Sequence, residues 1–217
     1  MIINRRGIAL VAGMATSVLL SAGALITSTG SANAAVTNEE AAPDFTLTNS
    51  YGEEVSLSDF AGQRVVLEWT NHGCPFVKKH YAKPPANMQS LQAGAGEDEA
   101  VWLTIVSSAP GKQGHVTGDE ANKLTENRGA SPAHVLLDPT GEVGRLYDAK
   151  TTPHIYIIDE DGMLVYQGAI DDNPSSNVED IAAATNYVTA SFAALDAGEM
   201  PEPGTTKAYG CGVKYPD

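Results

Sequence analysis

The strongest restriction on the fold comes from residues 64–82, RVVLEWTNHGCPFVKKHYA. The apolar, β-branched run at residues 65–67 predicts a buried strand, and the small and polar residues after Trp69 predict a turn. Pro75 follows Cys74, and proline is favoured at the first position of a helix because its missing N–H would have no helical partner there. The sequence therefore predicts a strand that carries Cys74 to the first turn of a helix.

A thiol at the start of a helix is in a favourable place to ionise. It faces unpaired backbone N–H groups and the positive end of the helix dipole, and both favour the thiolate, which is the reactive form. Lys78 and Lys79, one turn further on, would add positive potential. A buried and inert cysteine that happens to precede a helix is the alternative, since free cysteine is commonly a core residue.

The first 34 residues are typical of a secretory signal. Arg5 and Arg6 form a positive start, residues 8–26 are apolar but rich in small residues, and residues 32–34, Ala-Asn-Ala, fit the cleavage rule. A membrane anchor is the alternative, but small and polar residues dilute the run below a sustained span. We expect a signal peptide at residues 1–34 and an exported chain, periplasmic or secreted.

The composition restricts the partners of the chain. The formal net charge of the 217 residues is −14, and removal of the signal leaves the mature chain more acidic because both charges in that segment are Arg. Such a surface repels nucleic acid and anionic lipid. The acidic residues lie mostly beside turn residues, which indicates a solvated surface. We therefore expect no nucleic-acid partner and, after signal cleavage, no stable membrane span.

Both cysteines, Cys74 and Cys211, remain in the mature chain. An exported chain meets an oxidising compartment, so an even number of cysteines suggests that they can pair. A permanent bond between them would close a long loop and could stabilise the fold by roughly 5 kcal/mol. A structural disulfide therefore stays open beside a catalytic pair.

The remaining pattern predicts strands alternating with helices. Strands are expected at residues 43–48, 55–57, 64–69, 101–106, 134–137, 154–158 and 164–167, the first two and the last two as hairpins. Helices are expected after Cys74, and at residues 86–93, 119–128, 142–147 and 178–195. This order predicts an α/β fold with a mixed central sheet and flanking helices. We expect one domain at residues 35–200 and a tail at residues 201–217 that carries Cys211.

Four motifs carry a resemblance to a known family: WTNHGCPFVKKHY, SSAPGKQGHVT, TTPHIYIID and YGCGVKY. With a cysteine at a strand-to-helix corner and Thr152-Pro153 before a late strand and hairpin, the chain resembles the thioredoxin fold. More narrowly it is similar to the redoxin family, of peroxiredoxin-like or alkyl hydroperoxide reductase and thiol-specific antioxidant type. It looks like an exported member with an N-terminal hairpin and a C-terminal cysteine, and the resemblance covers nearly all of the mature chain.

The resemblance implies a site and a chemistry. Pro153 would lie in a cis-proline loop that faces the active cysteine and shapes the groove for a partner. Cys74 would attack a disulfide or a peroxide, and Cys211, on a mobile tail, would resolve the intermediate. Thr70 and Asn71 would hydrogen-bond the thiolate. The implied partners are a thiol or disulfide protein or a peroxide, with no bound cofactor.

The chain also departs from the patterns of this superfamily. Val77 stands where a thioredoxin-type pair needs its second cysteine, so that helix turn holds no dithiol. Leu67 and Asn71 stand where the peroxiredoxin pattern places Pro and Thr or Ser. An arginine that polarises a peroxide could be any of three residues, Arg64, Arg128 or Arg145.

Two other functions compete with a redox enzyme. One is a non-enzymatic binding domain in which a Cys74–Cys211 bond holds the tail. The other is a copper site, because thiolate and imidazole suit that metal. Its ligands would be Cys74 and some of four histidines, His72, His80, His115 and His154, which show no ligand spacing.

Overall fold

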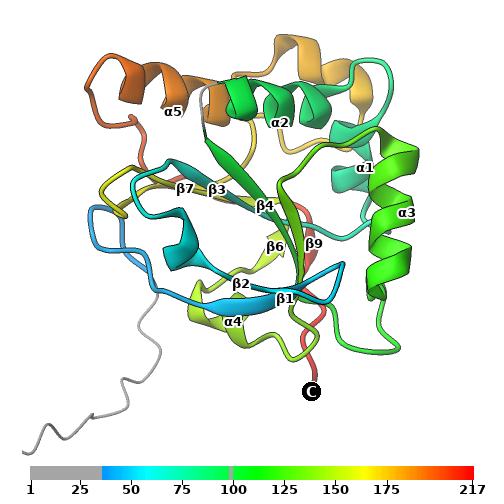
Figure 1. The fold of residues 1–217 in the computed structure, drawn as a ribbon. Helices are drawn as coiled ribbons and strands as arrows, with labels where there is room; N and C mark the ends of the chain where they lie inside the picture. The colour runs from blue at the N-terminus through cyan, green and yellow to red at the C-terminus, as the bar shows by residue number, and fades with distance from the viewer. Residues whose placement is uncertain (1–35, 98–99) are drawn as a thin grey trace, which may run out of the picture. The chain divides into compact units, whose positions relative to one another are not determined.

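A seven-stranded mixed sheet forms the centre of the structure (Figure 1). The computed structural model describes residues 36–97 and 100–217, so the expected signal at residues 1–34 lies outside the described residues. The strands of the sheet are β1 Thr46–Asn49, β2 Glu54–Ser56, β3 Val65–Trp69, β4 Val101–Val106, β5 His134–Leu137, β7 His154–Ile158 and β8 Leu164–Gly168. Every predicted strand is present, with bounds that differ by a few residues at most.

The order across the sheet is β2-β1-β5-β4-β3-β7-β8. β3 pairs in parallel with β4, and β4 pairs in parallel with β5, whereas β7 runs antiparallel to β3. The N-terminal hairpin β1–β2 extends the sheet beyond β5, and β8 closes the other edge. This arrangement confirms the prediction of a thioredoxin-like α/β fold with a mixed sheet and an added N-terminal hairpin. A separate ladder joins β6 Thr151–Thr152 to β9 Cys211–Gly212.

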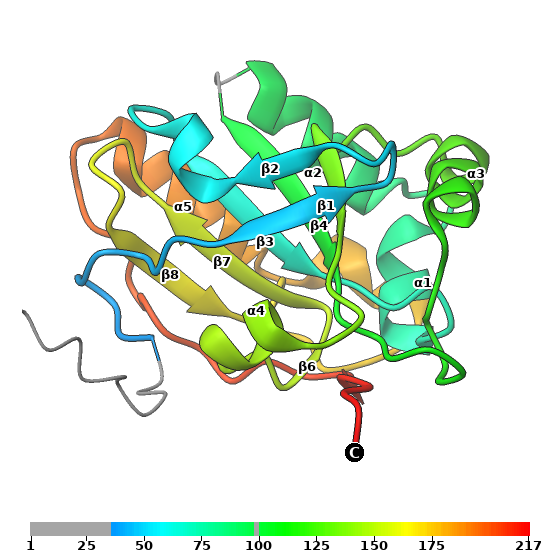
Figure 2. The same ribbon diagram turned by 60° about the horizontal axis from the view of Figure 1, so that its bottom comes forward.

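Helices cover both faces of the sheet (Figure 2). They are α1 Pro75–Tyr81, α2 Asn87–Glu97, α3 Gly118–Arg128, α4 Glu142–Leu146 and α5 Tyr187–Asp196, with 3₁₀ helices at Leu57–Phe60 and Val178–Ala183. Strand β3 shows why both faces need cover, because all five of its residues are buried. Leu67 packs in the core beneath α4, and its neighbour Val66 packs in the core beneath α1, α2 and α5. The central strand is thus fixed from two sides.

The predicted single helix at residues 178–195 is wrong. The chain instead forms a 3₁₀ helix that ends at Ala183, an extended residue Ala184 and then α5, which begins at Tyr187. The side chain of Asn186 accepts hydrogen bonds from the N–H groups of Val188 and Thr189, and so caps the new helix. The apolar spacing continues across this break, so it does not show where the first helix ends. Asn186, a residue type favoured at helix starts, is the sequence signal that marks the beginning of α5.

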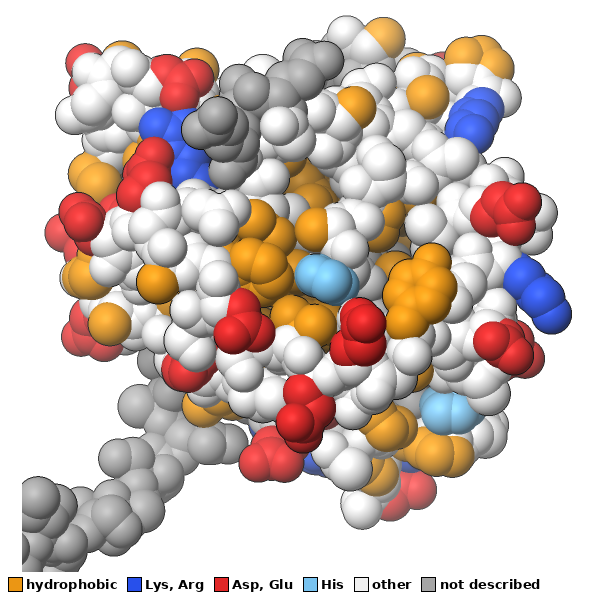
Figure 3. Space-filling view, viewed as in Figure 1, with side chains coloured by type: hydrophobic (Ala, Val, Ile, Leu, Met, Phe, Trp, Pro, Cys, Tyr) orange, Lys and Arg blue, Asp and Glu red, His pale blue; other side chains and the backbone are white. Residues whose placement is uncertain are grey.

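The surface agrees with the acidic composition (Figure 3). Acidic side chains are spread over the face seen there, around a central hollow in which hydrophobic side chains are visible. In the part of the chain that the structure describes, no helix has both the length and the apolar character needed to span a membrane.

Candidate functional site

Cys74 lies at the corner that the sequence predicts. It is the N-cap residue of α1, and Pro75 is the first residue of that helix. Its N–H donates to the carbonyl oxygen of Asn71 at 3.0 Å, and the side chain of Asn71 accepts from the N–H of Gly73 at 2.9 Å. The turn therefore holds its own shape, and the Cys74 side chain is fully buried at its end.

Three distant parts of the chain meet at this sulfur. The thiol of Cys74 donates to the carbonyl oxygen of Thr152 at 3.2 Å. The next peptide bond, Thr152–Pro153, is cis, and Thr152 in β6 pairs with Cys211 in β9 (Figure 1). Both cysteines are free thiols. The structure thus places Cys74, Cys211 and the Pro153 loop in one site.

The two thiols have different tendencies to ionise. Burial raises the pKa of Cys74, but hydrogen bonds from the thiol of Cys211 and from the N–H groups of Val77 and Cys211 outweigh it, and the net pKa is lowered. Burial, the hydrogen bond to Cys74 and the charge of its thiolate raise the pKa of Cys211 to about 11. Cys74 is therefore the thiol that ionises more readily, and Cys211 is the thiol that stays protonated beside it.

The tail that carries Cys211 is anchored, which corrects the expectation of a mobile tail. Two residues before Cys211, the hydroxyl of Tyr209 donates to Asp171, and it lies 3.3 Å from the imidazole of His80. The ring of Tyr209 packs edge-on against Phe76, with 5.8 Å between the ring centres. These contacts fix the tail against α1, the helix that Cys74 caps.

A second anchor follows Cys211. The hydroxyl of Tyr215 donates to the carbonyl oxygen of Ala149 at 2.6 Å, and the guanidinium of Arg145 lies 4.7 Å from the centre of the Tyr215 ring. Lys112 adds a hydrogen bond from its ammonium group to the carbonyl oxygen of Tyr215 at 2.9 Å. Cys211 is thus held from both sides by contacts that need no disulfide.

The first anchor rests on a buried ion pair that the sequence did not reveal. Nζ of Lys79 lies 3.1 Å from a carboxylate oxygen of Asp171, and the side chains are 0% and 3% exposed. Lys79 also donates to the carbonyl oxygen of Asn173 at 3.0 Å. The positive charge of Lys79 is therefore neutralised by Asp171. The sequence predicted instead that this charge would add positive potential at Cys74. Lys78 is exposed.

The hydroxyl of Thr70 does not form the expected hydrogen bond to Cys74. It is buried and has no hydrogen-bond partner among the described residues. The amide of Asn71 is also used elsewhere, since it donates to the carbonyl oxygen of Gln113 at 3.1 Å. The side chains of Thr70 and Asn71 therefore point away from the sulfur. The Cys74 thiolate is stabilised instead by the thiol of Cys211, by the N–H groups of Val77 and Cys211, and by the hydroxyl of Thr152.

The three candidate arginines have other neighbours. Arg64 pairs with Glu160 and Asp196, at 2.7 and 2.5 Å. Arg145 stacks on Tyr215, and Arg128 lies 4.3 Å from the centre of the Tyr81 ring. None of these contacts involves Cys74.

The histidines offer no support for a copper site. Among residues 36–97 and 100–217, no group of three or more His, Cys, Asp and Glu side chains is placed to hold a metal ion. His80 is hydrogen-bonded between Asn87 and Tyr209, and burial lowers its pKa to about 4. Burial likewise lowers the pKa of His154 to about 4. His80 and His154 are thus neutral core side chains.

Comparisons with known proteins agree with this fold. The profile of the AhpC/TSA family matches residues 39–167. An uncharacterized conserved protein from Geobacillus kaustophilus is 28% identical, with a TM-score of 0.67 over 83% of this chain and 93% of its own. A hypothetical protein from Sinorhizobium meliloti 1021 is 21% identical, with a TM-score of 0.68 over 84% of this chain and 97% of its own.

A more distant structure has the same fold. A putative protein disulfide isomerase from Bacteroides thetaiotaomicron is 19% identical, with a TM-score of 0.51 over 77% of this chain and 91% of its own. The search among curated proteins found no match.

Proposed function

The chain belongs to the AhpC/TSA family, and from this we propose that it is a thiol-based oxidoreductase in which Cys74 attacks and Cys211 resolves. The observation that carries the proposal is the direct contact between the two thiols. One has a lowered pKa at the start of a helix, and the other is held beside it on a paired strand. A nucleophile and a resolving thiol need this proximity.

The proposed reaction is a two-electron exchange. The Cys74 thiolate attacks one sulfur of a substrate disulfide, forms a mixed disulfide and releases the other sulfur as a thiolate. Cys211 then loses its proton and attacks the Cys74 sulfur, which releases the second substrate thiolate and leaves a Cys74–Cys211 disulfide. The substrate is reduced to two thiols, and an external dithiol reductant returns the protein pair to its reduced form.

The change of charge at Cys74 assists the second step. Burial, a hydrogen bond and the Cys74 thiolate raise the pKa of Cys211. Once Cys74 has become part of a mixed disulfide, its negative charge is gone, and Cys211 ionises more readily. The resolving thiol is therefore activated only after the first attack.

The surroundings favour a disulfide over a peroxide as substrate. The hydroxyl of Thr70 has no contact with Cys74, and Arg64, Arg128 and Arg145 contact other groups. Among residues 36–97 and 100–217 the hydroxyl of Thr152 hydrogen-bonds the Cys74 sulfur, but no contact of a guanidinium with that sulfur is found that would polarise a peroxide. The Pro153 loop beside Cys74 supports a role in receiving an extended partner, since its neighbour Thr152 already pairs with a strand.

The test is oxidation of the reduced protein by one equivalent of a small disulfide or, separately, of hydrogen peroxide. We expect the disulfide to convert both thiols rapidly into an intramolecular bond, and the peroxide to do so slowly. The rate should rise with pH as the Cys74 thiolate forms, and should level off at a lower pH than for a free cysteine because its pKa is lowered.

Two outcomes would contradict this. If the oxidation rate rises with pH as it does for an ordinary cysteine thiol, Cys74 is not an activated nucleophile. A reduction potential of the Cys74–Cys211 bond below about −300 mV would mark the bond as structural, and the chain as a stapled binding domain.

We also propose that the chain is exported with residues 1–34 as a cleaved signal, on the pattern of its first residues. The expected result is a mature chain that begins at Ala35, checked by N-terminal sequencing of the protein from its native host. A mature protein that retains residues 1–34 would contradict cleavage.

A further inference from the structure

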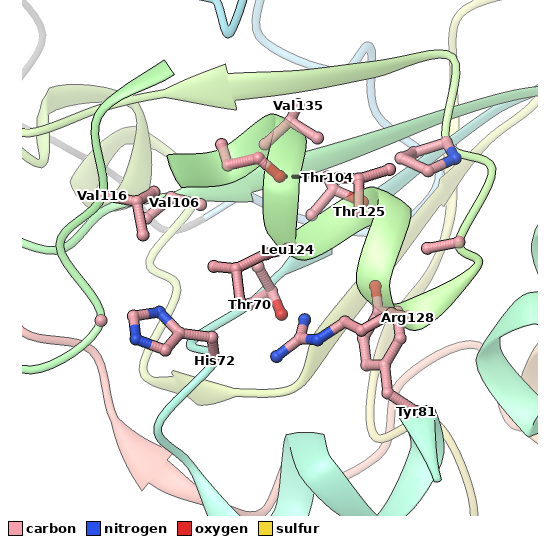
Figure 4. A pocket seen from close by; sticks show the side chains of 14 residues that line it. Thr70, His72, Tyr81, Thr104, Val106, Val116, Leu124, Thr125, Arg128 and Val135 are labelled. Carbon is pink, nitrogen blue, oxygen red and sulfur yellow. Dashed lines mark hydrogen bonds between the residues drawn. The ribbon is translucent and has the colours of Figure 1, made fainter. Parts of the chain in front are cut away.

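A small hollow is bounded by α3, the face of β4 and β5, and the turn that follows β3 (Figure 4). Its space, with the open mouth included, is about 410 Å³. The walls are mostly apolar and include Val106, Val116, Leu124 and Val135. The hollow therefore suits a ligand of a few heavy atoms with a hydrocarbon part.

One polar group in this hollow is buried without a partner. Thr70 is 6% exposed, and its hydroxyl makes no hydrogen bond within the described part of the chain. A buried hydroxyl without a partner destabilises the fold unless a ligand or water binds it. The other hydroxyls that line the hollow are already used: those of Tyr81 and Thr104 donate to Glu68 at 2.9 and 3.1 Å, and that of Thr125 donates to the carbonyl oxygen of Ala121 at 3.0 Å. Thr70 is thus the hydroxyl left available.

A guanidinium group faces the same space. Arg128 is the last residue of α3, and its side chain lies over the ring of Tyr81, with the guanidinium carbon 4.3 Å from the ring centre. In residues 36–97 and 100–217, no carboxylate lies within ion-pair distance of it. Figure 4 shows this guanidinium and the hydroxyl of Thr70 pointing toward each other across the hollow, with His72 at the side.

From these groups we propose that the hollow binds a short-chain monocarboxylate. The carboxylate accepts hydrogen bonds from the guanidinium of Arg128 and the hydroxyl of Thr70, and the alkyl chain packs against Val106, Leu124 and Val135. Guanidinium is the side chain best matched to a carboxylate, which it binds through two parallel hydrogen bonds. Inorganic phosphate fits less well, because the walls are mostly apolar and Arg128 is the one Lys or Arg among the described residues that line the hollow.

The buried carboxyl group of Glu68, which lies near the hollow, does not prevent a carboxylate ligand from binding there. The oxygens of Glu68 are covered by donors from Tyr81, Trp102 and Thr104, and burial raises its pKa, which favours the neutral form. His72 is neutral near pH 7, since burial and the positive charges of Arg128 and Lys78 lower its pKa. The guanidinium is therefore the dominant charge that faces the hollow.

The test is a calorimetric titration of the reduced full chain with sodium butyrate, with butanol and inorganic phosphate as comparison ligands. We expect saturable binding of butyrate, and at least about tenfold weaker binding of the other two, since each loses either the charge or the apolar fit. Arg128→Gln should weaken butyrate binding about tenfold or more, and Thr70→Val about threefold to tenfold.

Arg145→Gln is the matched control, because Arg145 stacks on a tyrosine ring in the same manner but does not line the hollow. It should bind butyrate as the unchanged protein does. Thr70→Val keeps the shape of the side chain and removes the unpartnered hydroxyl, so it should melt at the same or a higher temperature and remain testable. The absence of saturation, or equal losses in Arg128→Gln and Arg145→Gln, would overturn the proposal.

Discussion

Replacing Cys74 with serine is expected to reduce disulfide turnover to the uncatalysed rate. A serine hydroxyl does not ionise near neutral pH and is a poor nucleophile toward sulfur, so the first step is lost. Replacing Cys211 with serine should instead leave one stoichiometric reaction per chain and block the cycle when no external thiol is present, because the mixed disulfide on Cys74 has no internal thiol to resolve it. The measurement is the release of substrate thiol in the presence and absence of an external dithiol reductant.

The two variants control for each other. Each removes one sulfur from the same site, so a loss caused by misfolding would affect both in the first turnover, whereas the proposed roles affect only Cys74→Ser there. Mass spectrometry of Cys211→Ser after one turnover should find the substrate half attached to Cys74. Full cycling by Cys74→Ser would exclude Cys74 as the attacking residue.

Replacing Asp171 with alanine is expected to lower the free energy of unfolding by about 3–5 kcal/mol. Asp171 pairs with the fully buried Lys79 and accepts the hydroxyl of Tyr209, so its removal leaves a buried cation without a partner. The measurement is urea unfolding of the reduced protein, which keeps a Cys74–Cys211 bond from contributing. The same change should loosen the tail around Cys211.

Two further variants test the cause of that loss. Lys79→Met combined with Asp171→Leu removes both charges and should recover most of the stability, since an apolar pair of similar size can replace a buried ion pair. Lys150→Ala breaks the exposed pair between Lys150 and Asp148 and should cost less than about 1 kcal/mol. If Asp171→Ala costs no more than Lys150→Ala, the buried pair does not anchor the fold.

The elements near Cys74 could be predicted because their signals are local. An apolar run, a polar turn and Pro75 lie within a dozen residues, and each limits the backbone by itself. The break before α5 was missed because the apolar spacing continues through it, and only the capping role of Asn186 marks the new start. Hydrophobic periodicity indicates which side chains are buried, but it does not indicate where the backbone hydrogen bonds of a helix end.

The rest of the site depends on contacts between distant residues. Asp171 meets Tyr209 and Lys79 only after the sheet has formed, and no spacing in the sequence links them. Glu68 stands in an apolar strand, and its donors lie on other elements, among them Tyr81 in α1 and Trp102 and Thr104 in β4. Thr70 was expected to hydrogen-bond the Cys74 sulfur, which is close to it in sequence. In the structure its side chain lines the hollow instead.

The strand that bears Cys211 also has a consequence for selectivity. It belongs to the same molecule as the sulfur that it covers, so its local concentration there exceeds that of any free competitor. Under the proposed function, a reaction partner must displace this strand before it reaches Cys74. If Cys74 is oxidised to a sulfenic acid, the proposed resolving thiol of Cys211 is already adjacent, so the time in which irreversible sulfinic acid can form is shorter.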